Sequence, residues 1–355
     1  MGNYKDLKYS FPTSAITSGT FADARIAASN VNQHATTFDD NQIINDLSTL
    51  GLRVHTQENL SGSNTNSSSF DVFQDATKIT SLTNTLRNDS EFISAASTSQ
   101  VEATYPGGGA SASSTAGGSY GAATAFANNS SQFATAGGTN DTDTWYLSMD
   151  FGSGNEKIIT SYSLDVGGTF GNGSPLGWTF RGADNAGLGT GASIKDTVSN
   201  NNGGSNPYSK TFLDSTTAKR FWGLNVVLSG SNNYIYVTEL NLFETVTSVN
   251  ATGSFEGTAI TAGSSTNKMG AVITYQDNAG TNTLNTDIVL QLSADNGSNF
   301  ATATLTALPD FATGIKMAKV NDLSVTAGTQ LKYKINFANQ TGSKNARIRG
   351  VSLQY

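Results

Sequence analysis

The chain has 355 residues, a length at which a single hydrophobic core has usually stopped growing, so two or three domains are expected. Its net charge of −7 argues against nucleic-acid binding, and its lack of cysteine excludes disulfides and thiolate zinc sites. Charged residues make up only 13% of the chain, and Ser, Thr, Asn and 37 glycines supply the other polar positions. This composition favours strands and turns, so we expect a mainly β protein.

The first residues, MGNYKDLK, lack the apolar stretch of a signal peptide, and no later run is long enough to cross a bilayer. We therefore expect synthesis in a cytosol and no membrane insertion. Residues 14–34 are too poor in apolar side chains to form a core in one chain, and their strings SGTFADARI and SNVNQH resemble phage tail-fibre proteins. The resemblance implies that residues 1–39 attach the chain to other virion proteins and that the chain is made in a host cytoplasm.

A helical pattern begins at Asp40, which is a suitable capping residue. Ile43, Leu47, Leu50 and Val54 follow one another at intervals of four, three and four residues, the spacing of a coiled-coil seam. Two heptads are marginal alone. The sequence therefore leaves two alternatives: three such helices pack on one another, or one amphipathic helix docks on its own chain.

The next forty residues are predicted to be extended. Residues 60–69, LSGSNTNSSS, have the composition of a polar linker. Residues 70–96, which begin FDVFQD, resemble a segment of marine phage virion proteins and are expected to cross a neighbouring chain. We assign residues 40–100 to a helical oligomerisation and linker region.

Alternating strands mark a domain over residues 101–246. Ile158, Tyr162 and Leu164 fall on one predicted face of the first strand, with Ile159 on the other. Residues 234–242 repeat the alternation, and glycine-rich turns lie between the two strands. One antiparallel sandwich fits both ends of the region.

Five separated elements follow one another in this region: WYLSMDFG (145–152), a strand, PLGWTFRGAD (175–184), RFWGL (220–224) and a closing strand to residue 243. In this order they resemble a discoidin-like, galactose-binding-like domain. The sequence departs from the family after residue 184, where no tryptophan follows the turn. The resemblance implies a glycan site in loops at one end of the sandwich. Its expected contacts are Phe170 and Asn172 in one loop, and Asn202, Asn206 and Tyr208 in another.

Residues 247–355 are predicted to form a second antiparallel sandwich. Leu331, Tyr333, Ile335 and Phe337 alternate with polar residues, and the Asp-Asn-Gly sequence at 295–297 is typical of a hairpin turn. The segment resembles the C-terminal module of phage virion proteins, notably in LNTDIVLQLSADNGSNF and YKINFANQTGSKNARIRGVSLQY.

The sequence offers little for catalysis. The two histidines, His34 and His55, lie outside both predicted sandwiches, which leaves a serine triad without its base. A glycosidase needs only two carboxylates, and we weighed Asp141, Asp143, Asp184 and Glu239 against solvated surface, which we favour. Trp145, Trp178 and Trp222 are expected in the core rather than on a sugar platform.

Metal binding stays open at one place. Asn140, Asp141 and Asp143 could bind a structural calcium ion, with a solvated loop as the alternative. No other cofactor is expected.

These observations predict a homotrimeric virion protein that is not an enzyme. A fibre segment and a coiled-coil-like helix would precede two antiparallel β-sandwiches, and the protein would be a fibre or tail-associated adhesin that binds host-surface glycan. The alternatives are an architectural head-fibre or tail-adaptor protein that binds no receptor, and a fibre-borne glycan hydrolase.

Overall fold

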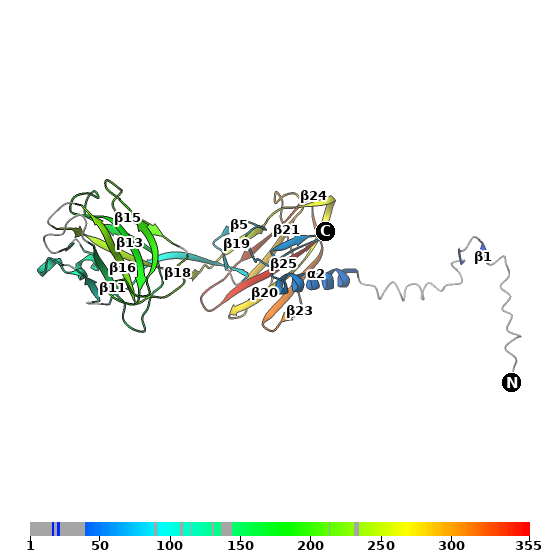
Figure 1. Cartoon of the computed structure of the whole chain (residues 1–355). Helices are drawn as coiled ribbons and strands as arrows, with labels where there is room; N and C mark the ends of the chain where they lie inside the picture. The colour runs from blue at the N-terminus through cyan, green and yellow to red at the C-terminus, as the bar shows by residue number, and fades with distance from the viewer. Residues whose placement is uncertain are drawn as a thin grey trace, which may run out of the picture. The chain divides into compact units, whose positions relative to one another are not determined.

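The computed structural model describes residues 16–17, 20–21, 40–88, 91–106, 109–113, 115–129, 131–135, 144–212, 214–230 and 234–355 (Figure 1). In these ranges strands predominate, their sheets are antiparallel, and the α-helix is α2 (Asp40–Gln57). The predicted mainly β fold with a helix near the N-terminus is confirmed. β1 (Ile16–Thr17) and β2 (Thr20–Phe21) pair within the expected fibre segment, whose other residues up to 39, His34 included, lie outside the described ranges. No helix in the described ranges has the length and apolarity needed to span a membrane.

The chain divides into two compact units. One is Thr98–Ser248, and the other combines Met1–Ser97 with Val249–Tyr355. The sequence predicts four consecutive regions instead, 1–39, 40–100, 101–246 and 247–355. The main difference is that residues 40–97 belong with the C-terminal strands rather than forming a region of their own.

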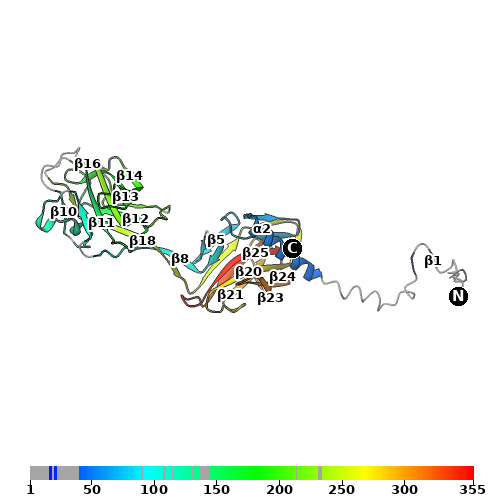
Figure 2. The same cartoon turned by 60° about the horizontal axis from the view of Figure 1, so that its bottom comes forward.

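The Thr98–Ser248 unit is a β-sandwich. Its five-stranded sheet has the order β14-β13-β16-β11-β9, its four-stranded sheet has the order β15-β12-β18-β8, and β10 pairs with β17 (Figure 2). The strands are β8 (Ala96–Glu102), β9 (Ala110–Ala112), β10 (Phe133–Ala134), β11 (Trp145–Asp150), β12 (Ile159–Asp165), β13 (Pro175–Ala183), β14 (Ser193–Val198), β15 (Tyr208–Thr211), β16 (Phe221–Ser229), β17 (Tyr236–Val237) and β18 (Glu239–Val249). Two short 3₁₀ helices, Gly118–Tyr120 and Ala122–Phe126, precede β10.

Three tryptophans fill the core of this sandwich, as predicted. Trp145, Trp178 and Trp222 are buried, and each indole N–H has an acceptor. Trp145 donates to Ser229 Oγ at 3.1 Å, and Trp178 donates to the hydroxyl of Tyr162 at 2.7 Å. A buried indole N–H without a partner would be costly, so these bonds fix how each ring is oriented.

The first predicted strand buries Tyr162 and Leu164 on one face as expected, but its start differs from the prediction. The register of β12 against β18 shifts between Ile159 and Ser161, which marks a β-bulge. The extra residue changes which side chains point inward. Ile159 therefore joins Tyr162 in the core, while Ile158, which we placed on the inward face, is 38% exposed.

The second unit is built around one long strand, β24. The first part of β24 pairs with β20, and its last part pairs with β21 and β19 on either side. The strands are β3 (Gly62–Asn64), β4 (Ser68–Asp71), β5 (Ile79–Thr83), β6 (Leu86–Asn88), β7 (Phe92–Ser94), β19 (Gly253–Gly257), β20 (Ile260–Ala279), β21 (Ile288–Ser293), β22 (Ala301–Thr302), β23 (Thr306–Ala312), β24 (Ile315–Phe337) and β25 (Asn345–Gln354). The predicted turn at 295–297 follows β21, with positive φ angles at Asn296 and Gly297.

Residues 60–97 complete this unit. The predicted polar linker forms the hairpin of β3 and β4, and β4 and β7 both pair with β25. β5 pairs with β19. The buried rings of Phe70 and Phe73 and the buried Ile93 enter the same unit, so the predicted crossing to a neighbouring chain is replaced by pairing within the chain.

We predict that residues 96–249 fold alone and that residues 249–355 do not, because the latter lack α2 and the strands that cover β25 and β19. The Ala95 carbonyl accepts the N–H of Asn250 at 2.9 Å, so the cut ends of the second unit meet. A fragment joining residues 40–95 to 250–355 through a short Gly-Ser linker should therefore fold. Circular dichroism and thermal melting would test all three fragments, and cooperative melting of 249–355 alone would contradict this division.

Asp71 is a buried carboxyl on β4. Its Oδ1 accepts the N–H of Phe73 at 2.9 Å, and its Oδ2 lies 3.4 Å from the hydroxyl of Tyr333, which donates to it. Burial raises the pKa of Asp71 to about 6, and it also raises the pKa of Tyr333 well above its usual value. The folded chain therefore holds the proton of the Asp71 carboxyl more tightly than the unfolded chain does.

The pKa of Asp71 predicts a stability that falls with rising pH. A carboxyl with a folded pKa above its unfolded pKa of 3.8 stabilises fully below pH 3.8 and loses that contribution as the pH passes about 6. With Asp71→Asn, the stability of the variant relative to wild type should rise by about 2 kcal/mol between pH 4 and pH 7. Urea titrations at each pH would measure it, and a constant difference between the two proteins would contradict the assignment.

Candidate functional site

Two loops meet at one end of the Thr98–Ser248 sandwich. Residues 166–174 connect β12 to β13, and residues 199–207 connect β14 to β15. Because β12 and β15 are antiparallel, with Leu164 opposite Tyr208, the end of one strand lies beside the start of the other. The N–H of Gly203 donates to the Phe170 carbonyl at 2.7 Å and joins the loops.

Asn206 and Asp165 hold the first loop in place. The Asn206 side chain accepts the N–H of Val166 at 2.9 Å and donates to Asp165 Oδ1 at 2.8 Å. The same carboxylate oxygen accepts the N–H of Gly167 at 2.6 Å. Gly167 has a φ of 74°, and a Cβ there would lie 2.7 Å from Thr238 Oγ1, so this turn requires glycine.

The two predicted aromatic contacts support the loops from inside. Phe170 is 1% exposed and stacks on Trp178 with ring centres 5.8 Å apart, so its ring is not available to cover a sugar. Tyr208 is half-buried and packs edge-on against Trp178 at 5.2 Å. The sequence could not separate an exposed loop aromatic from one folded into the core.

The hydroxyls of Tyr208 and Tyr162 both donate to Asp196 Oδ2, at 2.9 Å and 2.7 Å. Burial, together with the neighbouring Asp196, raises the pKa of Tyr208 to about 12 and moves that of Tyr162 higher still. Both phenols therefore stay protonated at neutral pH and keep these donors.

An open hollow of about 610 Å³ lies between the loops. Its lining is polar and rich in backbone: Asp165, Gly167, Gly168, Thr169, Gly203, Gly204, Ser205 and Asn206. Of the five predicted contacts, Asn206 lines the hollow, while Asn172 and Asn202 are exposed in its two loops. The sequence analysis did not name Thr169 and Ser205 as contacts. The glycine-rich runs beside them were the signal that could have pointed to this part of the two loops. Hydroxyls, amides and exposed peptide groups can exchange hydrogen bonds with a polyol.

The candidate carboxylates do not form a catalytic pair in the described part of the chain. Asp184 follows β13 and forms an ion pair with Lys219 at 3.0 Å, whereas Glu239 begins β18 in the other sheet. Asn140, Asp141 and Asp143, the calcium candidates, lie outside the described residues. Among the residues that are described, no group of three or more His, Asp or Glu side chains could hold a metal ion.

The helix α2 offers a second candidate surface, in the other unit. Ile43, Leu47, Leu50 and Val54, the predicted seam, are 41%, 58%, 57% and 42% exposed. The opposite face is buried against β25, β4 and β20, and its members are Asn45, Ser48, Leu52 and His55. The helix therefore docks on its own chain by its more polar face and leaves the predicted seam free.

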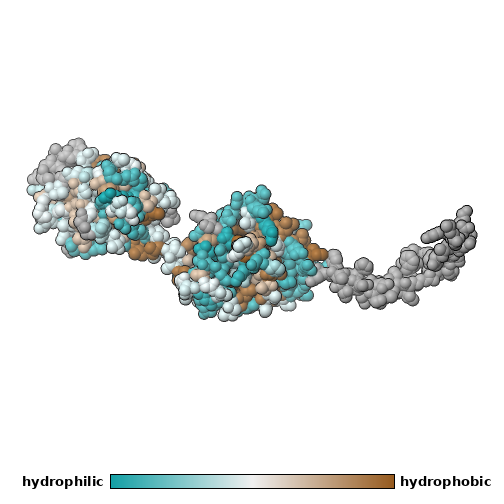
Figure 3. Space-filling model, turned by 90° about the horizontal axis from the view of Figure 1, so that it is seen from below, coloured by the Kyte–Doolittle hydropathy of each residue, from teal (hydrophilic) through white to brown (hydrophobic). Residues whose placement is uncertain are grey.

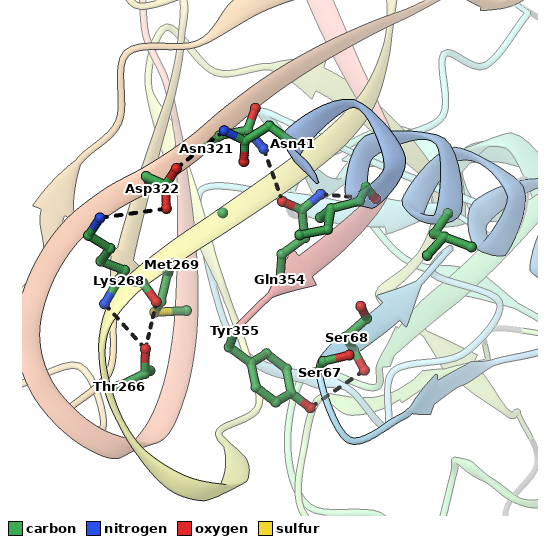
Figure 4. Close-up of a pocket in the computed structure, with 13 residues that line it drawn as sticks. Asn41, Ser67, Ser68, Thr266, Lys268, Met269, Asn321, Asp322, Gln354 and Tyr355 are labelled. Atoms are coloured by element: carbon green, nitrogen blue, oxygen red, sulfur yellow. Dashed lines mark hydrogen bonds and ion pairs between the residues drawn. The ribbon is translucent and has the colours of Figure 1, made fainter. Parts of the chain in front are cut away.

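Gln354 anchors this polar face, and Figure 4 shows its side chain beside α2. Its side-chain amide donates to Ser48 Oγ at 2.9 Å and to Asn45 Oδ1 at 3.2 Å. Its carbonyl oxygen accepts from Asn321 at 3.3 Å, and Asn45 in turn donates to Asn321 at 3.1 Å. Because every member has a partner, this buried network favours one position of the helix.

Apolar and aromatic contacts fix the second half of α2. Leu52 is fully buried in a cluster with Phe70 and Met317. The His55 ring stacks on Phe70 with centres 5.1 Å apart, and its Nε2 lies 2.7 Å from Ser63 Oγ. His55 is thus a structural residue of the second unit, whereas the sequence placed it outside both sandwiches.

Comparisons with known proteins give partial likenesses only. No protein-family model and no curated protein matches the sequence. A chitosan-binding module 1 from the chitosanase/glucanase of Paenibacillus sp. IK-5 is 19% identical and covers 38% of this chain and 93% of its own, with a TM-score of 0.31. The family 32 carbohydrate-binding module of NanJ from C. perfringens, solved with galactose, is 19% identical and covers 38% of this chain and 92% of its own, with a TM-score of 0.31. The family 32 module of AlyQ, solved with 4,5-unsaturated mannuronic acid, is 18% identical and covers 41% of this chain and 98% of its own, with a TM-score of 0.30.

We predict that Tyr208→Phe destabilises the Thr98–Ser248 unit by roughly 1 to 2 kcal/mol, because the ring stays packed on Trp178 while the bond to Asp196 is lost. Denaturant unfolding would measure the change. Ser209→Ala, at an exposed position of the same strand, is the matched control and should be neutral. Equal free energies of unfolding for both variants would show that the Tyr208 hydroxyl does not contribute to stability.

Proposed function

We propose that this chain is a bacteriophage virion structural protein, a fibre or tail-associated adhesin that binds host-surface glycan through the Thr98–Ser248 unit. The observation that carries the glycan part is the polar hollow between residues 166–174 and 199–207. The virion part rests on the resemblance of residues 14–34 and of the C-terminal segment to phage proteins. In this proposal the assembly is a homotrimer, has no enzymatic activity and needs no cofactor, apart from calcium if residues 140–143 bind it.

The loops suit weak recognition of a sugar. Asn206, Asp165 and the Gly203 contact hold the backbone before any ligand arrives, so little ordering is needed on binding. The groups left at the surface are Thr169, Ser205 and the exposed Asn202. A few hydrogen bonds to hydroxyls support affinities of roughly millimolar order per site, which three copies would raise by avidity.

Charge narrows the ligand class. Asp165 lines the hollow, Lys and Arg do not, and the whole chain carries a net charge of −7. Negative potential at the site disfavours polyanionic glycans and favours neutral or basic sugars. We therefore propose neutral or amino sugars as the class of ligand.

The test is a double substitution at the hollow. Thr169→Ala with Asn202→Ala should abolish binding to neutral and amino sugars on a glycan array, since both side chains point from exposed loop positions that carry little of the core. Melting of the variant should match wild type. Titration of the strongest array ligand against each protein, followed by NMR, would give the change in affinity.

Asn155→Ala is the matched control, because Asn155 is an exposed loop asparagine before β12, at the other end of that strand. Sugar binding should survive in it. Unchanged binding by the Thr169/Asn202 variant would move the glycan site elsewhere, and release of reducing ends from a bound glycan would favour the hydrolase alternative.

A further inference from the structure

The exposed face of α2 is a continuous apolar stripe with defined ends. Ile43, Leu47, Leu50 and Val54 occupy successive d, a, d and a positions. One heptad before Leu47 stands Asp40, and one heptad after Leu50 stands Gln57, both exposed. Single apolar side chains on a surface are ordinary, whereas a contiguous stripe bordered by polar residues marks an interaction site.

The helix cannot bury this stripe by turning. Gln354 and Asn321 hold its first half, and Leu52 and the His55 ring hold its second half. Turning the stripe inward would leave the buried amides of that network without partners. The stripe therefore stays on the surface of the single chain, and Figure 3 shows apolar side chains among polar ones on one face of this unit.

We propose that the covering surface is the same stripe of a second copy of this chain, with the two α2 helices parallel. The inference rests on the homotrimer of the proposed function and adds the surface and the orientation. The a/d spacing is self-complementary, because each layer of a parallel coil brings identical positions together.

The threefold assembly of the proposed function sets the parallel arrangement. Identical helices related by a closed threefold axis run in the same direction along that axis, so each layer brings copies of one residue together. Arg53, at a g position beside the seam, does not decide the direction, because its guanidinium donates to the Phe311 carbonyl at 3.0 Å and lies over the Phe311 ring.

A hollow beside the stripe enlarges the docking surface (Figure 4). Its volume is about 290 Å³, and it is lined by Ile44 and Leu47 from α2, by Met269 from β20 and by Tyr355 at the chain end, among others. Two heptads alone are marginal. Because Leu47 belongs to both the stripe and the hollow, a neighbouring copy can fill both with one continuous contact.

The seam does not itself choose the number of chains. Ile43 at d with Leu47 at a favours three or four helices, while Leu50 at d with Val54 at a favours two. Three chains is the number set by the proposed function. The surface and the stoichiometry can thus be tested separately.

Cross-linking tests the surface, and the absence of cysteine in the chain makes the experiment clean. Ile43→Cys and Val54→Cys, each as a single variant of the full chain, should form disulfide-linked dimers on mild oxidation, because parallel copies bring identical layers within disulfide reach. In a trimer one chain in three stays unlinked. Leu82→Cys, equally exposed on β5, is the control and should stay monomeric on a non-reducing gel.

Light scattering completes the test. Wild type should have the mass of three chains at micromolar concentration, and Leu47→Asp with Leu50→Asp should dissociate it while circular dichroism and melting of the monomer show a folded chain. A mass of three chains without cross-links would overturn this surface and leave the homotrimer standing. Cross-links at a mass of two chains would support the surface and overturn the trimer. A monomeric wild type would overturn both the proposed interface and the homotrimer.

Discussion

The hydrogen bonds of the Gln354 side chain set the position of α2 in the second unit. This side chain lies at the end of β25 and bonds to Ser48 and Asn45 on α2, some three hundred residues earlier in the chain. β25 also pairs with β4, β7 and β20, so one strand gathers the N-terminal and C-terminal segments into one core. Because amides and a hydroxyl hold the first half of α2, Ile43, Leu47 and Leu50 remain on the outside. The polarity of this part of the docked face is what leaves the apolar stripe at the surface.

Part of this architecture could be predicted from the sequence, because periodicity carries it. The spacing from Ile43 to Val54 predicts the helix. The structure docks this helix on its own chain by its other, more polar face, which leaves the seam exposed. The strand ending at Phe337, β24, follows from alternation in the same way. The prediction that the three tryptophans, which lie in strands, belong to the core is also confirmed.

Other features depend on tertiary contacts that local pattern does not record. Residues 60–69 have the composition of a linker, yet they form strands because β25 supplies an edge for them. The bulge after Ile159 turns that side chain inward at the start of β12, and nothing in the alternation marks the bulge. At the candidate site, Phe170 and Tyr208 were expected to meet ligand because they lie in loops. Their rings instead pack on Trp178, and the small polar residues around the glycines remain at the surface.

The interrupted path of the chain has a consequence for its synthesis. The ribosome makes α2 and β3 to β7 first, but their partners on β25 are the last strand to emerge. The Thr98–Ser248 sandwich is complete long before that and can fold while translation continues, since domains generally fold as units during synthesis. During that interval the early segment has nothing to dock on, and the stripe on α2 belongs to a helix that is not yet anchored. The order of translation therefore leaves the second unit without a complete core until its last strand is made, so α2 is anchored only when the chain is finished.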